Sequence, residues 1–185
     1  MYPLLLICSL FAALLAVSAP AAAAQSKDDA LSGKEVEELR DAAYVPTDRI
    51  ETYEKILDTR ERTIEDLLAK PRHVTFGVDM HDAIDQFGAI ADEMNDNLDE
   101  LNAQHRDLRK VLPKLVKATE RWTTVLRSPG EDDAYKVVRK IALDAVKDTH
   151  DMAVEMEASE EAYFKAHPEA AKEEKTRKND PHAPQ

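Results

Sequence analysis

The chain has 185 residues, and its 37 acidic against 25 basic side chains give a formal net charge of -12 at pH 7 with neutral histidines. The phosphates of nucleic acid repel such an acidic chain, which argues against a nucleic-acid partner. Only 4 glycines and 5% aromatic residues are present, and alanine, leucine and charged residues dominate, as is typical of long helices.

The N-terminal segment, residues 1–24, has no charged side chain and carries an apolar run over residues 4–17. This run and the alanines at 22–24 predict a signal peptide that is cleaved before Gln25. An uncleaved membrane anchor is the alternative, because the uncharged segment is just long enough to span a bilayer. Pro20 and the alanines favour cleavage, which predicts a periplasmic or secreted protein.

The single cysteine, Cys8, lies within the segment that cleavage removes. The mature chain is therefore expected to lack disulfides, thiolate metal ligands, covalently attached c-type haem and cysteine nucleophiles. No second apolar run of bilayer length follows, so we expect no membrane span after removal of the signal peptide.

Two shorter helices are predicted before the central part of the chain. Residues 25–31 are polar and expected to be flexible. Ser32 and Glu35 then have the Ser-x-x-Glu spacing of a capping box, which predicts a short helix to about Tyr44. Pro46 forces the residue before it out of the α conformation, so a second helix is expected over residues 47–70. Residues 71–77 have no helical period and are predicted to be a connection.

A seven-residue pattern, close to that of a coiled coil, runs through residues 80–126. It places one side chain after another on a single helical face, and all but His105 and Thr119 are apolar. The positions are Met80, Ile84, Phe87, Ala91, Met94, Leu98, Leu101, His105, Leu108, Leu112, Leu115, Thr119, Trp122 and Leu126. We expect one long helix that bends near Pro113 without breaking, because the pattern continues across the proline.

The last predicted helix covers residues 132–166, after a short turn at Ser128, Pro129 and Gly130. Residues 168–185 are charged and almost free of large apolar side chains, which predicts a disordered tail. Short turns force antiparallel neighbours. The predicted fold is therefore all-α: an elongated antiparallel three-helix bundle with coiled-coil-like packing over residues 32–167, with a four-helix arrangement as the alternative.

Two polar residues, His105 and Thr119, interrupt this pattern. Of the two, His105 is the one that is predicted to have titratable groups nearby. Pairing residues across the turn near Pro129 places His105 close to Val154, one turn from His150, and the earlier connection brings Tyr44 near. One interpretation makes His105 and His150 candidate metal ligands between helices. The other makes His105 a structural residue that fixes the register of the helices. We favour the structural interpretation, because no histidine has the Glu-x-x-His spacing of di-iron bundles.

The charges of the long helix are segregated, with an acidic first half and a basic second half. The same pairing places the acidic half opposite glutamates of the last helix, which predicts one strongly negative region. Its residues are Asp92, Glu93, Asp96, Asp99, Glu100, Glu157, Glu160 and Glu161. Such a region would dock a cationic partner, or would only keep an exported protein in solution.

These patterns predict a non-enzymatic exported protein that acts by protein–protein interaction, as a scaffold, adaptor or chaperone-like surface in the cell envelope. The sequence has no glycine-rich phosphate loop and no nucleophile elbow, and we expect no cofactor. The alternative is a small-ligand or metal-binding bundle centred on His105 and His150. The partner is not identified, and the pattern is compatible with both a monomer and a homo-oligomer.

Overall fold

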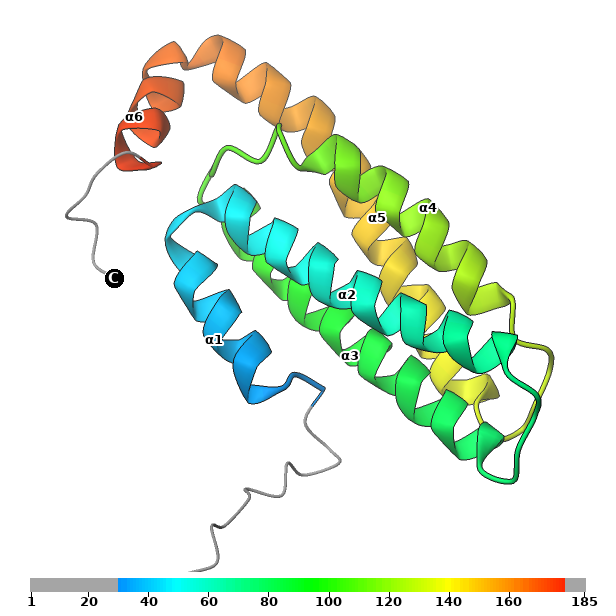
Figure 1. Cartoon of the computed structure of the whole chain (residues 1–185). Coiled ribbons are helices and arrows are strands. Elements are labelled where there is room, and N and C mark those ends of the chain that lie inside the picture. Colours follow the sequence, from blue (N-terminus) through cyan, green and yellow to red (C-terminus); the bar gives the residue numbers. More distant parts are fainter. Residues whose placement is uncertain (1–29, 179–185) are drawn as a thin grey trace, which may run out of the picture.

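The computed structural model describes residues 30–178, and the regular elements in this range are all helical (Figure 1). They are α1 (Gly33–Asp41), a short 3₁₀ helix η1 (Ala42–Tyr44), α2 (Pro46–Ala69), α3 (Phe76–Ala103), α4 (Leu112–Arg127), α5 (Lys136–Ala166) and α6 (Pro168–Lys178). The all-α prediction is confirmed for this range. The predicted signal peptide and residues 25–29 of the predicted flexible segment lie outside it.

The capping box begins α1 as the sequence predicts. The Ser32 backbone N–H donates to the Glu35 carboxylate at 2.7 Å, and the Glu35 backbone N–H donates to the Ser32 hydroxyl at 3.3 Å. Arg60 of α2 donates to the same carboxylate at 2.8 and 2.9 Å. One glutamate therefore both caps α1 and fastens it to α2.

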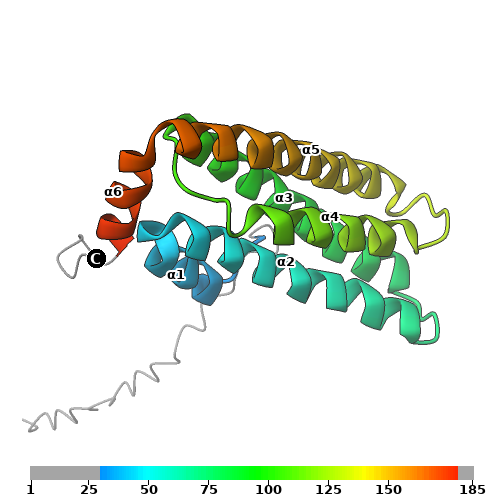
Figure 2. The same cartoon turned by 90° about the horizontal axis from the view of Figure 1, so that it is seen from above.

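The four long helices α2, α3, α4 and α5 form a bundle in which α3 and α4 lie diagonally opposite. Helix α2 packs against α3 and α4, and α5 packs against the same two helices (Figures 1 and 2). The pairs α2/α3 and α4/α5 are antiparallel hairpins, whereas α3/α5 and α2/α4 run in parallel. The bundle is therefore the four-helix alternative, rather than the three-helix arrangement expected first.

The difference arises because the predicted long helix is broken at residues 104–111. His105 has φ 51, the left-handed conformation that follows many helix ends. The Arg106 N–H donates to the Leu101 carbonyl and the His105 N–H to the Asn102 carbonyl, both at 3.0 Å, which is the Schellman motif. Pro113 lies in the first turn of α4, where proline is tolerated. The helix is therefore not bent at Pro113 as expected. It is broken eight residues earlier in the chain, at His105.

The core is continuous through all four helices and includes nearly every position of the seven-residue pattern. Trp122 of α4 is fully buried, packs edge-to-face on Phe87 at 5.8 Å, and donates from Nε1 to Asp58 of α2 at 3.0 Å. Arg121 bonds Asp58 and Glu61 on the same helix, with 2.9 Å to Glu61 Oε2. The parallel pair α2/α4 is therefore held by one aromatic anchor and a charged cluster beside it.

The segment predicted to be a disordered tail is helical as far as the structure describes it. Pro168 ends α5 at Ala166 and occupies the start of α6, a position where its missing N–H breaks no helix bond. Figure 2 shows α6 turned across the end of the bundle. Residues 179–185 lie outside the described range.

The parallel pair α3/α5 is in close contact at Gly88, and this contact yields a stability prediction. A Cβ built on Gly88 would lie 3.3 Å from both Cα and Cβ of Ala142. Gly88→Leu is expected to lower the free energy of unfolding by about 2 kcal/mol, because the helices must separate. Urea denaturation measures this loss. Ala89→Leu, at the exposed neighbouring position, is the matched control and should change stability by less than about 0.5 kcal/mol. Equal losses in the two variants would contradict the close contact.

Candidate functional site

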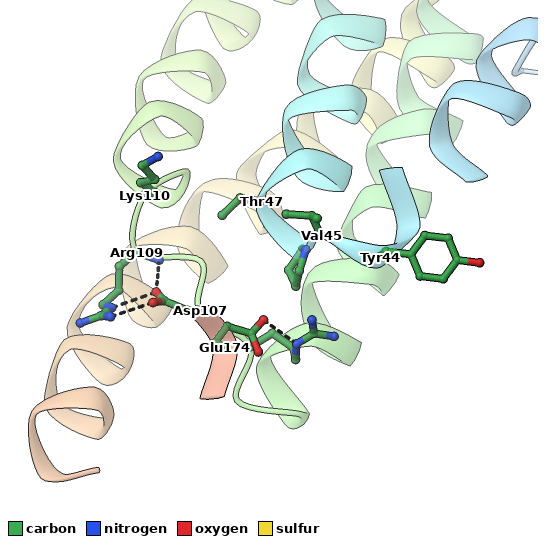
Figure 3. A pocket seen from close by; sticks show the side chains of 9 residues that line it. Tyr44, Val45, Thr47, Asp107, Arg109, Lys110 and Glu174 are labelled. Carbon is green, nitrogen blue, oxygen red and sulfur yellow. Dashed lines mark hydrogen bonds and ion pairs between the residues drawn. The ribbon is translucent and has the colours of Figure 1, made fainter. Parts of the chain in front are cut away.

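The candidate site is a cavity of about 400 Å³ at the end of the bundle, where the chain crosses from α3 to α4 (Figure 3). We call it the crossover pocket. Its lining comes from the end of η1, the start of α2, the connection 104–111 and α6. The lining residues are Tyr44, Val45, Pro46, Thr47, Arg106, Asp107, Arg109, Lys110 and Glu174. A cavity of this size is within the range of ligand sites.

One side of the crossover pocket is apolar because of the way α2 begins. Val45 has an extended backbone, φ -114 and ψ 107, as expected for a residue before proline. Pro46 is buried, and Val45 is half-buried beside it. Tyr44, predicted to lie near His105, lines this pocket together with Arg106, the residue that follows His105.

The other side is charged, and each of its two arginines holds a carboxylate. Arg106 Nε donates to Glu174 Oε1 of α6 at 2.9 Å, and the two side chains are only 16% and 17% exposed. Arg109 donates to both oxygens of Asp107, at 2.9 and 2.7 Å (Figure 3). The Arg109 guanidinium also lies 4.4 Å from the centre of the Phe164 ring. Lys110 is exposed and adds a further positive charge.

A buried glutamate of α5 holds the connection in place. The Leu108 N–H donates to Glu160 Oε2 at 2.9 Å, and Glu160 is only 5% exposed. Burial raises the pKa of Glu160 to about 7, opposed by the Leu108 bond and reinforced by the negative charge of Asp107. Glu160 was expected in the acidic docking surface, and this expectation is wrong. Its position between Met156 and Phe164, both buried at i±4 spacing, was the sequence signal for the core.

The two histidines proposed as metal ligands are not brought together. His105 is exposed and stacks on Tyr163 with ring centres 4.2 Å apart, whereas His150 Nδ1 lies 2.9 Å from the Thr119 hydroxyl. Residues 150 and 163 of α5 are about 20 Å apart along the helix axis. The predicted pairing failed because the α4/α5 hairpin turns later in the chain than the turn assumed at Pro129. Among residues 30–178, no group of three or more histidine, cysteine or acidic side chains could hold a metal ion.

The remaining acidic residues lie elsewhere than predicted, because α3 runs parallel to α5. Asp92 lies beside Asp96 and Asp148, and burial followed by repulsion from these two carboxylates raises the pKa of Asp92. Glu93 accepts a hydrogen bond from the Tyr53 hydroxyl at 2.8 Å. The other members of the predicted surface, Asp99, Glu100, Glu157 and Glu161, are exposed. The negative charge is therefore spread along α3 and α5 without forming one enclosed site.

A second hollow, of about 630 Å³, follows the groove between α4 and α5. Its lining includes several cations of α5, but these already have carboxylate partners. Lys136 pairs with Asp133, Lys140 with Asp144 and Lys147 with Asp151, and Arg139 pairs with Glu131. Arg127 of α4 also lines the groove, and Leu143 is the one large apolar side chain in its lining. The crossover pocket has an apolar side formed by Tyr44, Val45 and Pro46, and for this reason it is the stronger candidate.

Comparison with protein-family models, curated protein sequences and solved structures finds no match to this chain. Within the described range, none of the helices combines the length and apolar character that crossing a membrane requires. The site must therefore be interpreted from its own residues. Sequence reasoning missed Arg106, Arg109, Lys110 and Glu174 as a group, since the first three were placed on a continuous helix and the last in a disordered tail.

The raised pKa of Glu160 predicts how stability depends on pH. In the folded chain the Glu160 carboxyl keeps its proton up to about pH 7. In the unfolded chain the same carboxyl releases its proton near its ordinary pKa of 4.5. Between these values the folded chain binds more protons, so its free energy of unfolding falls as pH rises and levels off above pH 7. Relative to Glu160→Gln, which can still accept the Leu108 bond, the wild type should lose up to roughly 3 kcal/mol between about pH 4 and pH 8.

Urea denaturation across this pH range measures the difference. Glu157→Gln, at an exposed position one turn earlier on α5, is the matched control and should follow the wild-type profile. If the wild type and Glu160→Gln have parallel profiles, Glu160 ionises as an ordinary exposed carboxyl and the prediction is wrong.

Proposed function

We propose that this is an exported binding protein that recognises an acidic segment of another envelope or secreted protein at the crossover pocket. The observation that supports the proposal best is the Arg106–Glu174 pair. In it, an arginine of the pocket binds a carboxylate that a helix presents, at 2.9 Å and with little exposure to solvent. This pair supports the proposal that the pocket accepts a carboxylate from a protein segment.

The arrangement of charge and apolar surface suits binding better than catalysis. The lining residues of the crossover pocket include no histidine or cysteine, and both of its carboxylates accept hydrogen bonds from guanidinium groups. Because guanidinium groups already engage these carboxylates, they are poorly placed to accept a proton from a substrate. Arginine beside apolar surface is, in contrast, a common composition of protein-binding hot spots. We therefore assign no enzymatic activity to the pocket.

Lys110 provides a direct test of the binding proposal. Purified wild-type protein is used as bait in an envelope extract of the source cells, beside Lys110→Glu and Lys117→Glu. Both lysines are exposed and both variants change the charge equally, but only Lys110 lines the crossover pocket. We expect a protein that is retained by the wild type and Lys117→Glu and is reduced at least tenfold by Lys110→Glu, measured by quantitative mass spectrometry.

Two outcomes contradict this proposal. Retention that the two variants reduce equally would mean that general electrostatic attraction, rather than the pocket, captures the partner. The absence of any retained protein, together with a small molecule that co-purifies with the wild type and is lost in Lys110→Glu, would make the pocket a small-ligand site.

Export is the second part of the proposal, and the uncharged segment 1–24 supports it. Expression of the full chain in the source cells is expected to yield an extracytoplasmic protein whose first residue is Gln25, identified by intact mass and N-terminal sequencing. Ala24→Asp should block processing, because the cleavage site requires a small residue. A protein that retains residue 1 and sediments with membranes would instead indicate the uncleaved anchor.

A further inference from the structure

A further cavity lies beside α1, the short helix that packs against α2 on the outside of the four-helix bundle (Figure 1). Its volume is about 290 Å³, and its lining comes from the α1 region, α2 and α3. We call it the α1 pocket. It shares no lining residue with the crossover pocket, so what it binds is a separate question from the function proposed above.

Part of the α1 pocket is apolar. This part is formed by Val36 and Leu39 of α1, together with Leu31 before the helix and Ala43 after it. Leu39 is buried, but Val36 is still 50% exposed. An aliphatic group bound here would cover part of Val36, and the burial of apolar surface would favour binding.

The polar part of the lining carries a positive and a negative charge that share one hydroxyl. Tyr53 of α2 is buried, and its hydroxyl donates to Glu93 Oε1 of α3 at 2.8 Å. Arg49, one turn earlier on α2, hydrogen-bonds the same hydroxyl. Burial and the bond to Glu93 raise the pKa of Tyr53 to about 12, so the hydroxyl keeps its proton and remains a neutral group between the two charges.

The two charges are not neutralised by ion pairs. Within the part of the chain that the structure describes, Arg49 and Glu93 do not pair with each other, and neither has another ion-pair partner. The Nε of Arg49 is buried and has no hydrogen-bond partner in this range. A half-buried guanidinium usually has a carboxylate partner, because a charge held away from water costs free energy. Arg40, the other cation of the lining, pairs with Glu37 on its own helix.

We propose that the α1 pocket binds a free α-amino acid with an aliphatic side chain of about the size of leucine. The carboxylate of the amino acid binds the Arg49 guanidinium, its ammonium group binds the Glu93 carboxylate, and its side chain lies against Val36 and Leu39. An α-amino acid carries its two opposite charges on either side of one carbon atom, which suits a cation and an anion that share one hydroxyl. A cavity of about 290 Å³ is at the lower end of the range for ligand sites, as a ligand of this size requires.

Ligands with one charge suit the pocket less well. A carboxylic acid would satisfy Arg49 but would be repelled by Glu93, and an aliphatic amine would be repelled by Arg49 in the same way. A peptide carries its terminal charges at opposite ends, so it cannot offer both to one pair of side chains. The combination of both charges with an apolar lining therefore selects a small zwitterion.

The first test is calorimetric titration of the wild-type protein, purified from the source cells, with four compounds. L-leucine has all three recognised groups, leucinamide lacks the carboxylate, 4-methylpentanoate lacks the ammonium group and glycine lacks the side chain. We expect leucine to bind with a Kd below about 1 mM, and each of the other three to bind at least about tenfold more weakly.

The second test assigns the two charges to their residues by repeating the titrations on variants. Arg49→Gln should abolish the preference for leucine over leucinamide, and Glu93→Gln should abolish the preference for leucine over 4-methylpentanoate. Arg62→Gln on α2 and Glu100→Gln on α3 are the matched controls, because both residues are exposed and neither lines the pocket. Both controls should keep the wild-type preferences.

Three results overturn the inference. If leucine does not bind, or binds no more tightly than the other three compounds, the pocket does not select an aliphatic zwitterion. If Arg49→Gln weakens leucine and leucinamide by the same factor, Arg49 only positions Tyr53. If Glu93→Gln leaves the preference over 4-methylpentanoate unchanged, Glu93 does not bind the ammonium group. The Lys110-dependent capture at the crossover pocket is judged separately, since none of these measurements involves its lining.

Discussion

The left-handed backbone of His105 is the constraint on which the rest of the structure depends. It ends α3 in a Schellman motif, and the chain then crosses the end of the bundle to the diagonal position of α4. A continuous helix would have kept the following residues on a regular helical surface. The break makes α3 and α5 parallel neighbours and places Arg106, Arg109 and Lys110 together at one end, opposite the start of α2.

The connection that results is anchored from both sides, although it has no regular structure. Leu108 and Val111 are fully buried in the core, and Glu160 accepts the Leu108 N–H from α5. These contacts hold the backbone while the residues between them project toward the pocket. A rigid backbone that carries charged side chains is what preorganised recognition requires. The buried carboxylate that holds it is also the group whose protonation changes near neutral pH.

The fold class could be predicted from the sequence because the periodicity of apolar residues indicates which side chains are buried. Every position of the seven-residue pattern except His105 is buried in the structure. The pattern could not reveal the break, because Leu101, Leu108 and Leu112 enter the core whether the chain continues as a helix or crosses the bundle. The residue that adopts the left-handed conformation after a helix is usually glycine or asparagine, which can be recognised in a sequence. Here histidine occupies this position.

The candidate site was not predictable for related reasons. Its residues come from three parts of the chain, and only the correct topology brings residues 44–47 next to residues 106–110 and Glu174. The composition of residues 168–178 is that of a disordered segment, and among the α6 side chains that the structure describes only two alanines and one glutamate are half-buried. The predicted proximity of His105 and His150 failed for a simpler reason. Moving the assumed turn by a few residues shifts every predicted pairing across a long hairpin.

Because the chain crosses the bundle diagonally, the contacts between hairpins join residues that are farther apart in the sequence than the contacts within a hairpin do. Within the hairpins, Tyr53 bonds Glu93 at a separation of 40 residues and Thr119 lies against His150 at 31. Between the hairpins, Asn95 bonds Ala145 at 50 and Lys114 bonds Glu51 at 63. Because longer loops cost more entropy to close, each hairpin is expected to form before the two dock. The pocket needs both hairpins and α6, so it is completed last, and a chain that has not finished folding offers no site to its partner.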